Sequence, residues 1–155
     1  MRVLIAAVGR PKDGALAAAI RDYEGRAARY WPMEVVEVKG ERGEGGLSSD
    51  VVKEREGGRL LRAVASASTL AACDPGGTSM TSERFAEWLR LQRDSARDVA
   101  FVIGGAFGLS DAVLQHADLR IAVAPWTLTH EMARLVLAEQ LYRAGTITRG
   151  EPYHK

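Results

Sequence analysis

Val99-Ala-Phe-Val-Ile103 runs directly into Gly104-Gly105-Ala-Phe-Gly108-Leu-Ser110 in the second half of the chain. Five consecutive apolar residues with β-branched and aromatic members are typical of a strand that is buried on both faces. The glycines indicate a tight turn after this strand, and Ser110 is a suitable N-cap for a helix. The stretch therefore predicts a strand–turn–helix unit of an α/β protein. The glycines alone leave open whether the turn binds a ligand or only needs positive φ.

The same alternation of short apolar runs and longer amphipathic runs continues along the chain. It predicts strands at residues 2–8, 33–38, 68–73, 99–103 and 119–124, and helices at 13–30, 50–65, from 82 onward, 110–116 and 130–142. A glycine-rich loop is expected at 39–49, a strand-ending turn at 74–77 and a polar tail at 145–155. This order is typical of a parallel sheet with helices on both faces. Ligands of such sheets bind beyond the carboxyl ends of the strands, so the loops after Cys73, Ile103 and Ala124 are the expected site.

Length and composition indicate one compact domain over residues 1–155, with a formal net charge of +1. No apolar run is long enough to span a bilayer, and the apolar N-terminus is better interpreted as a buried strand than as a signal peptide. The single cysteine, Cys73, suits the reducing cytoplasm. A net charge near zero argues against indiscriminate nucleic-acid binding but leaves room for a local basic face.

The residues of each expected loop have a purely structural interpretation as well as a functional one. Cys73 is interpreted as a small buried apolar residue without an activating base, and Asp74 as a turn residue bonded to its own backbone. In the segment 124–130, Thr129 is the expected N-cap of the last long helix. Backbone groups there could hold an adenine edge, with Trp126 or Leu128 over its face. His130 is either a base or an ordinary surface histidine.

Several motifs follow one another in order between residues 101 and 155, and the resemblance that they carry spans the whole chain. They are Phe101-Val-Ile-Gly-Gly105-x-x-Gly108-Leu-Ser110, Thr127-Leu128-x-His130, Arg134-x-x-x-x-Glu139-Gln-Leu-Tyr-Arg143-Ala144 and the terminal Pro152-Tyr-His-Lys155. Together they resemble the bacterial 23S ribosomal RNA pseudouridine N3-methyltransferases of the SPOUT class. The resemblance implies an α/β fold with a C-terminal trefoil knot. It also implies a homodimer in which the partner subunit completes the site, and S-adenosylmethionine held in the knot.

By position, the resemblance places the cofactor contacts on the three strand-end loops already chosen. They fall on Cys73, Gly105, Ala124, Pro125, Trp126, Thr127, Leu128 and Thr129. Two positions depart from the family pattern, which tends to have Leu at position 73 and Pro at position 129. Cys73 keeps a small apolar wall, whereas Thr129 lacks the fixed φ of proline.

The terminal segment provides the expected catalytic groups. The resemblance implies methyl transfer to N3 of a pseudouridine, which must lose its proton to become a good nucleophile. We expect His154 to accept that proton, Arg143 to stabilise the resulting anion and Tyr153 to stack on or orient the base, with His130 as a reserve base. A set of loop and terminal cations is expected around the mouth of the site: Arg10, Lys12, Lys39, Arg42, Arg143, Arg149 and Lys155.

The expected substrate is 23S ribosomal RNA folded in the ribosome, because so small a chain has no separate RNA-binding domain. Neither a metal nor a membrane is expected. Two other classes remain as alternatives. One is a nicotinamide-dependent oxidoreductase, although Gly9-Arg10-Pro11 does not form its first glycine turn. The other is a ribosome-binding module without catalysis.

Overall fold

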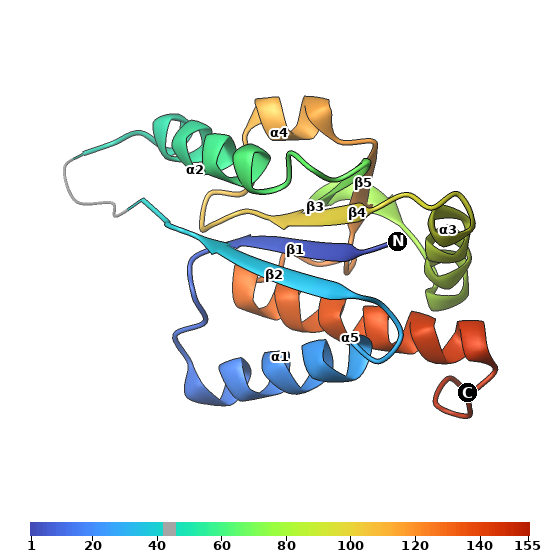
Figure 1. Ribbon diagram of the computed structural model, residues 1–155. Coiled ribbons are helices and arrows are strands. Elements are labelled where there is room, and N and C mark those ends of the chain that lie inside the picture. Colours follow the sequence, from blue (N-terminus) through green and yellow to red (C-terminus); the bar gives the residue numbers. More distant parts are fainter. Residues whose placement is uncertain (42–45) are drawn as a thin grey trace.

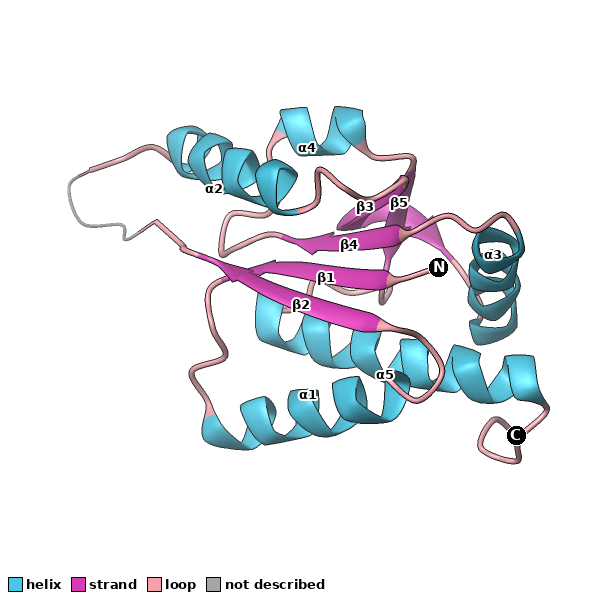
Figure 2. Ribbon diagram, viewed as in Figure 1, coloured by secondary structure: helices cyan, strands magenta, loops and turns pink. Residues whose placement is uncertain are grey.

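A computed structural model describes residues 1–41 and 46–155, and it consists of a five-stranded parallel sheet between helices (Figures 1 and 2). The strand order is β2-β1-β4-β3-β5, with every neighbouring pair parallel. Helices α1 and α5 cover one face, α2 and α4 cover the other, and α3 packs beside α5. The elements are β1 (Val3–Val8), α1 (Gly14–Ala27), β2 (Met33–Val38), α2 (Ser49–Ala63), β3 (Thr69–Ser79), α3 (Ser82–Asp94), β4 (Val99–Ile103), α4 (Asp111–His116), β5 (Leu119–Ala122) and α5 (His130–Arg149). The predicted fold class is therefore confirmed.

The continuous apolar strands are explained by two cores, one on each side of the sheet. Alternate residues of a strand point to opposite faces. In β1, Val3 and Ile5 belong to the core beneath α1 and α5, whereas Leu4 and Ala6 belong to the core beneath α2 and α4. All five residues of β4 are buried. The central strands thus leave only their carboxyl ends and following loops free to form a site.

Side-chain caps begin each helix. The predicted caps Ser110 and Thr129 accept hydrogen bonds from the backbone N–H groups three residues later, at 3.4 and 3.3 Å, and so begin α4 and α5. Asp13, Ser48 and Thr81 do the same for the other three helices. The helix predicted at 13–30 ends earlier, at Ala27.

The third strand is longer than predicted. The turn expected at 74–77 does not end β3, because pairing with β5 resumes after it, and Cys73 and Thr78 both lie opposite Ile121. The residues between them form an irregularity within the strand. A Cβ added at Gly77 would lie 2.6 Å from the carbonyl carbon of Arg120, so the return to β5 requires glycine. The last strand is correspondingly shorter than predicted and ends at Ala122.

Helix α5 also differs from the prediction. It continues for 20 residues to Arg149, where Gly150 ends it with φ of 66°, so residues 145–149 are helix rather than tail. The predicted tail begins at Gly145, but the absence of a side chain at this residue allows close packing within the helix region. A Cβ there would lie 2.3 Å from Cγ of Tyr30.

We predict that Gly145→Ala destabilises the protein by about 1–3 kcal/mol, because the new methyl group overlaps the base of the Tyr30 side chain. Urea unfolding followed by circular dichroism measures this change. Gly25→Ala in α1 is the matched control, since no atom lies within 4 Å of its added Cβ. That control is expected to be neutral or slightly stabilising. Equal unfolding midpoints for the two variants would show that Tyr30 does not require the glycine.

Candidate active site

The loops that follow β3, β4 and β5 meet at one pocket, where the sequence places the expected site. Its volume is about 600 Å³ including the open mouth, within the range of small-molecule sites. It is lined by Cys73, Asp74, Pro75, Ile103, Gly104, Gly105, Ala106, Gly108, Val123, Ala124, Trp126, Thr127, Leu128, His130 and Ala133. Three segments that are distant in sequence are thus brought together, as expected at the carboxyl end of a parallel sheet.

Six of the eight residues predicted to contact a cofactor line this pocket, and Pro125 and Thr129 do not. Thr129 instead caps α5. The prediction missed Val123 and Ala133, among others. Ala133 follows His130 by three residues on α5 and so lies on the same helix face, a spacing that could have identified it.

A glycine turn forms the wall of the pocket beyond β4. A Cβ added at Gly104 would lie 2.6 Å from the carbonyl oxygen of Gly108, so the turn can close only with glycine there. Gly108 has φ of 83°, and its N–H donates to the carbonyl of Gly105 at 3.1 Å. This compact turn lets a ligand approach the backbone closely. At the mouth, Trp126 is 77% exposed and presents an apolar surface.

Helix α5 begins at the opposite wall. Its first residue, His130, has a partly exposed side chain that lines the pocket, with Nε2 3.9 Å from Oε1 of Glu131. Glu131 also accepts the backbone N–H of Lys12 at 2.9 Å, which ties the loop after β1 to this helix end. The N-terminus of a 20-residue helix gives the wall a partial positive charge.

Cys73 and Asp74, where the regular pairing of β3 is first interrupted, have structural contacts. Cys73 packs against the core, and burial raises the pKa of its thiol to about 12, so the thiol stays protonated at neutral pH. This agrees with its interpretation as a small apolar residue. The Asp74 carboxylate accepts a hydrogen bond from Nη2 of Arg120 at 2.7 Å and thus links β3 to β5, a contact that the sequence did not indicate.

The three residues predicted to be catalytic lie together, at the far end of α5. The Arg143 guanidinium stacks over the Tyr153 ring at 4.6 Å, and the Tyr153 hydroxyl donates to Oε1 of Glu139 at 3.0 Å. Nε2 of His154 lies 2.8 Å from Oε1 of Glu83, while Nη1 of Arg143 lies 3.4 Å from Nδ1 of the same imidazole. Burial, followed by hydrogen bonding, raises the pKa of Tyr153. Hydrogen bonds from its own backbone N–H, Thr81 and His154 lower the pKa of Glu83 to about 2.

Most of the length of α5 separates this terminal cluster from the pocket. The pocket contains His130, the first residue of α5, whereas the tail follows Arg149, the last, and Figure 1 shows the C-terminus at the opposite end of the sheet. The tail turns back to Arg143, which follows His130 by 13 residues, so about 20 Å of helix lie between the backbones of these two residues. Within one chain, His154 and the strand-end pocket therefore cannot act on the same reacting atoms.

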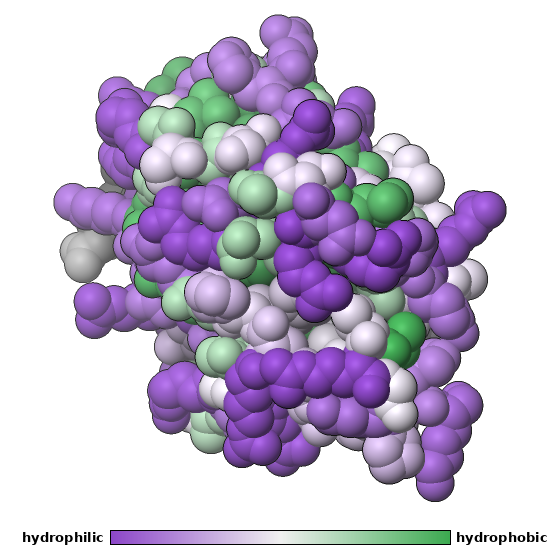
Figure 3. All heavy atoms as spheres, turned by 45° about the vertical axis from the view of Figure 1, so that its right-hand side comes forward, coloured by the Kyte–Doolittle hydropathy of each residue, from purple (hydrophilic) through white to green (hydrophobic). Residues whose placement is uncertain are grey.

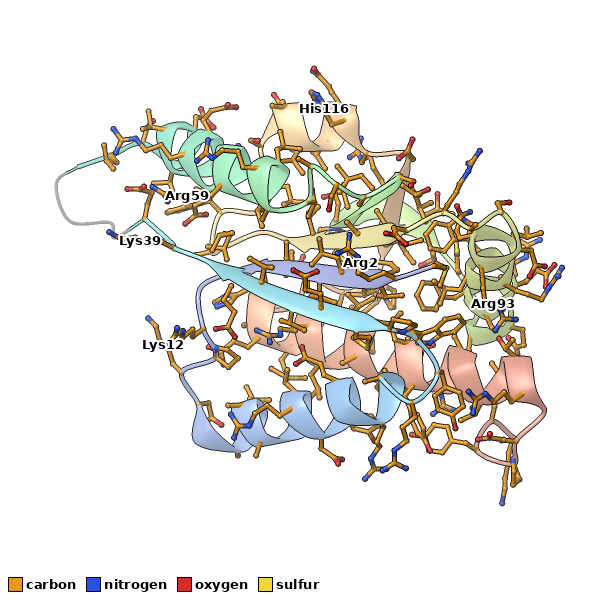
Figure 4. All side chains as sticks on the ribbon, viewed as in Figure 1. Arg2, Lys12, Lys39, Arg59, Arg93 and His116 are labelled. Atoms are coloured by element: carbon orange, nitrogen blue, oxygen red, sulfur yellow. The ribbon has the colours of Figure 1, made fainter. Side chains whose placement is uncertain are left out.

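The expected ring of cations is also divided between the two ends. Lys12 and Lys39 lie on the side of the strand carboxyl ends in Figure 4, and Arg10 pairs with Glu37 at 3.2 Å on that side. Arg143, Arg149 and Lys155 lie at the other end of α5, and Arg42 lies outside the described residues. The face around α3 is mostly hydrophilic, interrupted by apolar patches (Figure 3). The prediction of one cluster around one mouth is thus wrong for a single chain.

Within residues 1–41 and 46–155, no group of three or more His, Cys, Asp or Glu residues is arranged to hold a metal ion. In the same residues, no helix is both long enough and apolar enough to cross a membrane.

A parallel sheet with a glycine-lined pocket beyond three of its strands is the arrangement in which α/β proteins bind small molecules. The chain belongs to a methyltransferase family, because residues 1–154 match the family model described as a predicted SPOUT methyltransferase. The trefoil knot expected above follows from this membership, and the converging loops after β3, β4 and β5 are the segments that it would contain.

Relatives of the same length carry a more specific name. The chain is 61% identical to the ribosomal RNA large subunit methyltransferase H of Gemmatimonas aurantiaca and 45% identical to that of Anaeromyxobacter sp. strain K, each over 100% of both chains. Among solved structures, it resembles a probable methylase family protein from Haemophilus influenzae with a TM-score of 0.61 and 15% identity, over 99% of this chain and 70% of that one. A probable methyltransferase from Bordetella pertussis gives a TM-score of 0.57 and 17% identity, over 92% and 95%. These two structures support the fold.

Proposed function

We propose that this protein transfers the methyl group of S-adenosylmethionine to N3 of a pseudouridine in 23S ribosomal RNA, in the cytoplasm. The observation that carries the proposal is the strand-end pocket, which six of the expected cofactor residues line. The full-length identity of 61% to a ribosomal RNA large subunit methyltransferase supports the choice of substrate.

The residues of the pocket fit this cofactor better than a nicotinamide dinucleotide. Small residues and the glycine turn leave room for a nucleoside, and Leu128 and Val123 offer apolar contacts for an adenine. In the doubly wound oxidoreductase fold, the pyrophosphate of a dinucleotide lies on a glycine fingerprint that follows the first strand. The segment after β1 here, Gly9-Arg10-Pro11, does not have this pattern, and the pocket lies beyond β3, β4 and β5 instead. This arrangement, together with membership of the methyltransferase family, disfavours the alternative oxidoreductase.

The cofactor supplies an electrophilic methyl group when bound, so the protein's own residues have to position the base and handle its N3 proton. Arginine can only donate hydrogen bonds, so its contact with Nδ1 of His154 requires a neutral imidazole whose Nε2–H donates to Glu83. When the 3.4 Å contact between Nη1 of Arg143 and Nδ1 of His154 is released, Nδ1 can accept the N3 proton of the base. Arg143 then lies beside the base to stabilise its negative charge, and Tyr153 orients the ring.

The separation along α5 makes a second copy of the chain part of this proposal. A homodimer with antiparallel α5 helices would bring the tail of one protomer to the pocket of its partner. The same arrangement would join the two groups of cations into one basic surface for RNA, with Arg10 and Lys12 from one protomer and Arg149 and Lys155 from the other. Such a surface reads the shape of a folded RNA.

Calorimetric titration with S-adenosylmethionine, with NADH as control, tests the cofactor, and labelled methyl transfer to ribosomes and to naked 23S RNA tests the substrate. We expect binding of S-adenosylmethionine alone and transfer to ribosomes at a rate at least about tenfold above that to naked RNA. Binding without transfer to either RNA would favour the non-catalytic ribosome-binding module. Equal transfer to both would refute the requirement for the assembled particle.

A further inference from the structure

Two exposed aromatic rings lie on the loops that form the walls of the strand-end pocket. Phe107 follows β4 and is 55% exposed, and Trp126 follows β5 and is 77% exposed. The chain has three Phe and three Trp residues, and the other four lie in or against the core: Trp31, Phe85, Trp88 and Phe101. A large aromatic ring left in water forgoes the stabilisation of burial, so two such rings beside one pocket suggest a ligand that covers them.

The glycine turn after β4 holds Phe107 at the rim of the pocket. The hydrogen bond from the N–H of Gly108 to the carbonyl of Gly105 closes a four-residue turn, with Ala106 and Phe107 at its tip. Ala106 lines the pocket, whereas Phe107 does not. The exposed ring of Phe107 therefore points away from the cofactor and into solvent.

Trp126 belongs to another wall of the same pocket. It lies in the segment between the end of β5 at Ala122 and the cap Thr129, which begins α5. Because β3 lies between β4 and β5 in the sheet, the two rings are on loops that follow the strands on either side of β3. Trp126 lines the pocket although most of its surface is exposed, so its ring extends to the mouth. The cofactor contacts expected of this residue are then left to its backbone.

Exposed cations lie at the same edge of the sheet. The backbone N–H of Lys12 donates to Glu131, the neighbour of the pocket residue His130, and the Lys12 side chain is exposed. Arg10 lies in the same loop with 87% of its side chain exposed, and Figure 4 shows Lys39 on this side too. Aromatic rings that stack on bases, next to cations that contact phosphates, are the combination with which proteins bind unpaired RNA. A protein partner would not require these cations, so the charge favours RNA as the ligand of the rings.

We propose that Phe107 and Trp126 bind unpaired bases of the substrate RNA by aromatic stacking at the mouth of the strand-end pocket. This inference rests on the proposed function. Every base has a π-face, and a base that is splayed out of its helix regains on a protein ring the stacking that it has lost. With one ring on each of two walls, the RNA strand is held at the mouth, and the target base can reach the cofactor.

The variants Trp126→Ala and Phe107→Ala remove the rings one at a time. For each, we expect the KM for ribosomes in methyl transfer to rise about fivefold to a hundredfold, the range for loss of one stacked base, with a smaller change in kcat. Co-sedimentation with ribosomes should show the same loss of affinity without requiring transfer. Calorimetry should give an unchanged Kd for S-adenosylmethionine. Leu91→Ala on α3 is the matched control, because Leu91 is 49% exposed and does not line the pocket.

Replacement by other large side chains separates stacking from general apolar contact. Trp126→Phe and Phe107→Tyr keep a ring and should retain most of the affinity for ribosomes. Trp126→Leu and Phe107→Leu keep an apolar side chain without a π-face and should behave as the alanine variants do. Leucine variants that bind ribosomes as well as the aromatic ones would overturn the proposal.

The same variants test the other possible ligands of the rings. Alanine variants that become monomeric, as measured by light scattering, would show that the rings contact a second copy of the chain. A weakened Kd for S-adenosylmethionine with unchanged ribosome affinity would show that the Trp126 ring covers the cofactor. Either result would overturn the proposal. If the wild-type protein co-sediments with ribosomes but transfers no methyl group, the proposed function fails instead, and co-sedimentation of the variants still tests the rings.

Discussion

Gly104→Ala is expected to weaken the binding of S-adenosylmethionine by roughly tenfold to a hundredfold. The added methyl group would lie 2.6 Å from the backbone carbon and oxygen of Gly108, so the turn after β4 has to open. Because this turn forms one wall of the pocket, its displacement changes the backbone surface that a cofactor contacts. Calorimetry measures the Kd directly.

Gly58→Ala in α2 is the matched control for this variant, since its Cβ makes only an ordinary contact of 3.6 Å with Arg62. It should bind the cofactor as the wild type does. Unfolding experiments on both variants show whether any loss of affinity is local to the pocket. A Gly104→Ala protein with unchanged Kd would mean that the cofactor binds elsewhere.

His154→Ala is expected to lower the rate of methyl transfer by about 10²–10⁴-fold without changing the Kd for the cofactor, the usual range for loss of a proton acceptor. Its contacts with Arg143 and Glu83 lie at the end of α5 remote from the pocket, which explains why cofactor binding should be spared. His116→Ala in α4 is the control, because the imidazole of that exposed histidine contacts the carbonyl of Ala112 in its own helix. A transfer rate for His154→Ala equal to that of the control would remove the tail from the mechanism.

A mixing experiment extends this prediction to the dimer. Refolding equal amounts of the His154→Ala and Gly104→Ala proteins together produces mixed dimers with one intact pocket. They are assayed at a cofactor concentration that fills the wild-type pocket but leaves the Gly104→Ala pocket largely empty. If the tail acts on the partner's pocket, about a quarter of all sites regain both intact parts and activity returns. If each tail serves its own chain, the mixture stays as inactive as its components, and the antiparallel dimer is wrong.

The sheet and the pocket could be predicted because local patterns determine them. The buried strand Val99–Ile103 and the caps Ser110 and Thr129 are set by neighbouring residues, and the strand-end loops follow from the parallel topology. The errors involve contacts between distant segments. Gly145 is helical because it packs against Tyr30, and β3 resumes after the turn because Gly77 approaches β5.

The same distinction applies to the site. Its glycine turn and the segment 124–128 have local signals, whereas the burial of Glu56 behind Gly105 has none, since an acidic residue in an amphipathic helix normally faces solvent. Its burial depends on two glycines, at positions 40 and 105, far apart in sequence. The grouping of His154 with Glu83 likewise depends on α3 packing against α5. Residues whose roles depend on such packing could not be found from the sequence pattern.

The central claim is tested most directly by identifying the methylated nucleoside. Ribosomes from cells that lack this activity are incubated with the purified protein and labelled S-adenosylmethionine, and the large-subunit RNA is digested and analysed by mass spectrometry. Our account predicts a single labelled product, N3-methylpseudouridine, which the His154→Ala protein forms about 10²–10⁴-fold more slowly. Label on another nucleoside, or on ribosomal protein, would contradict it.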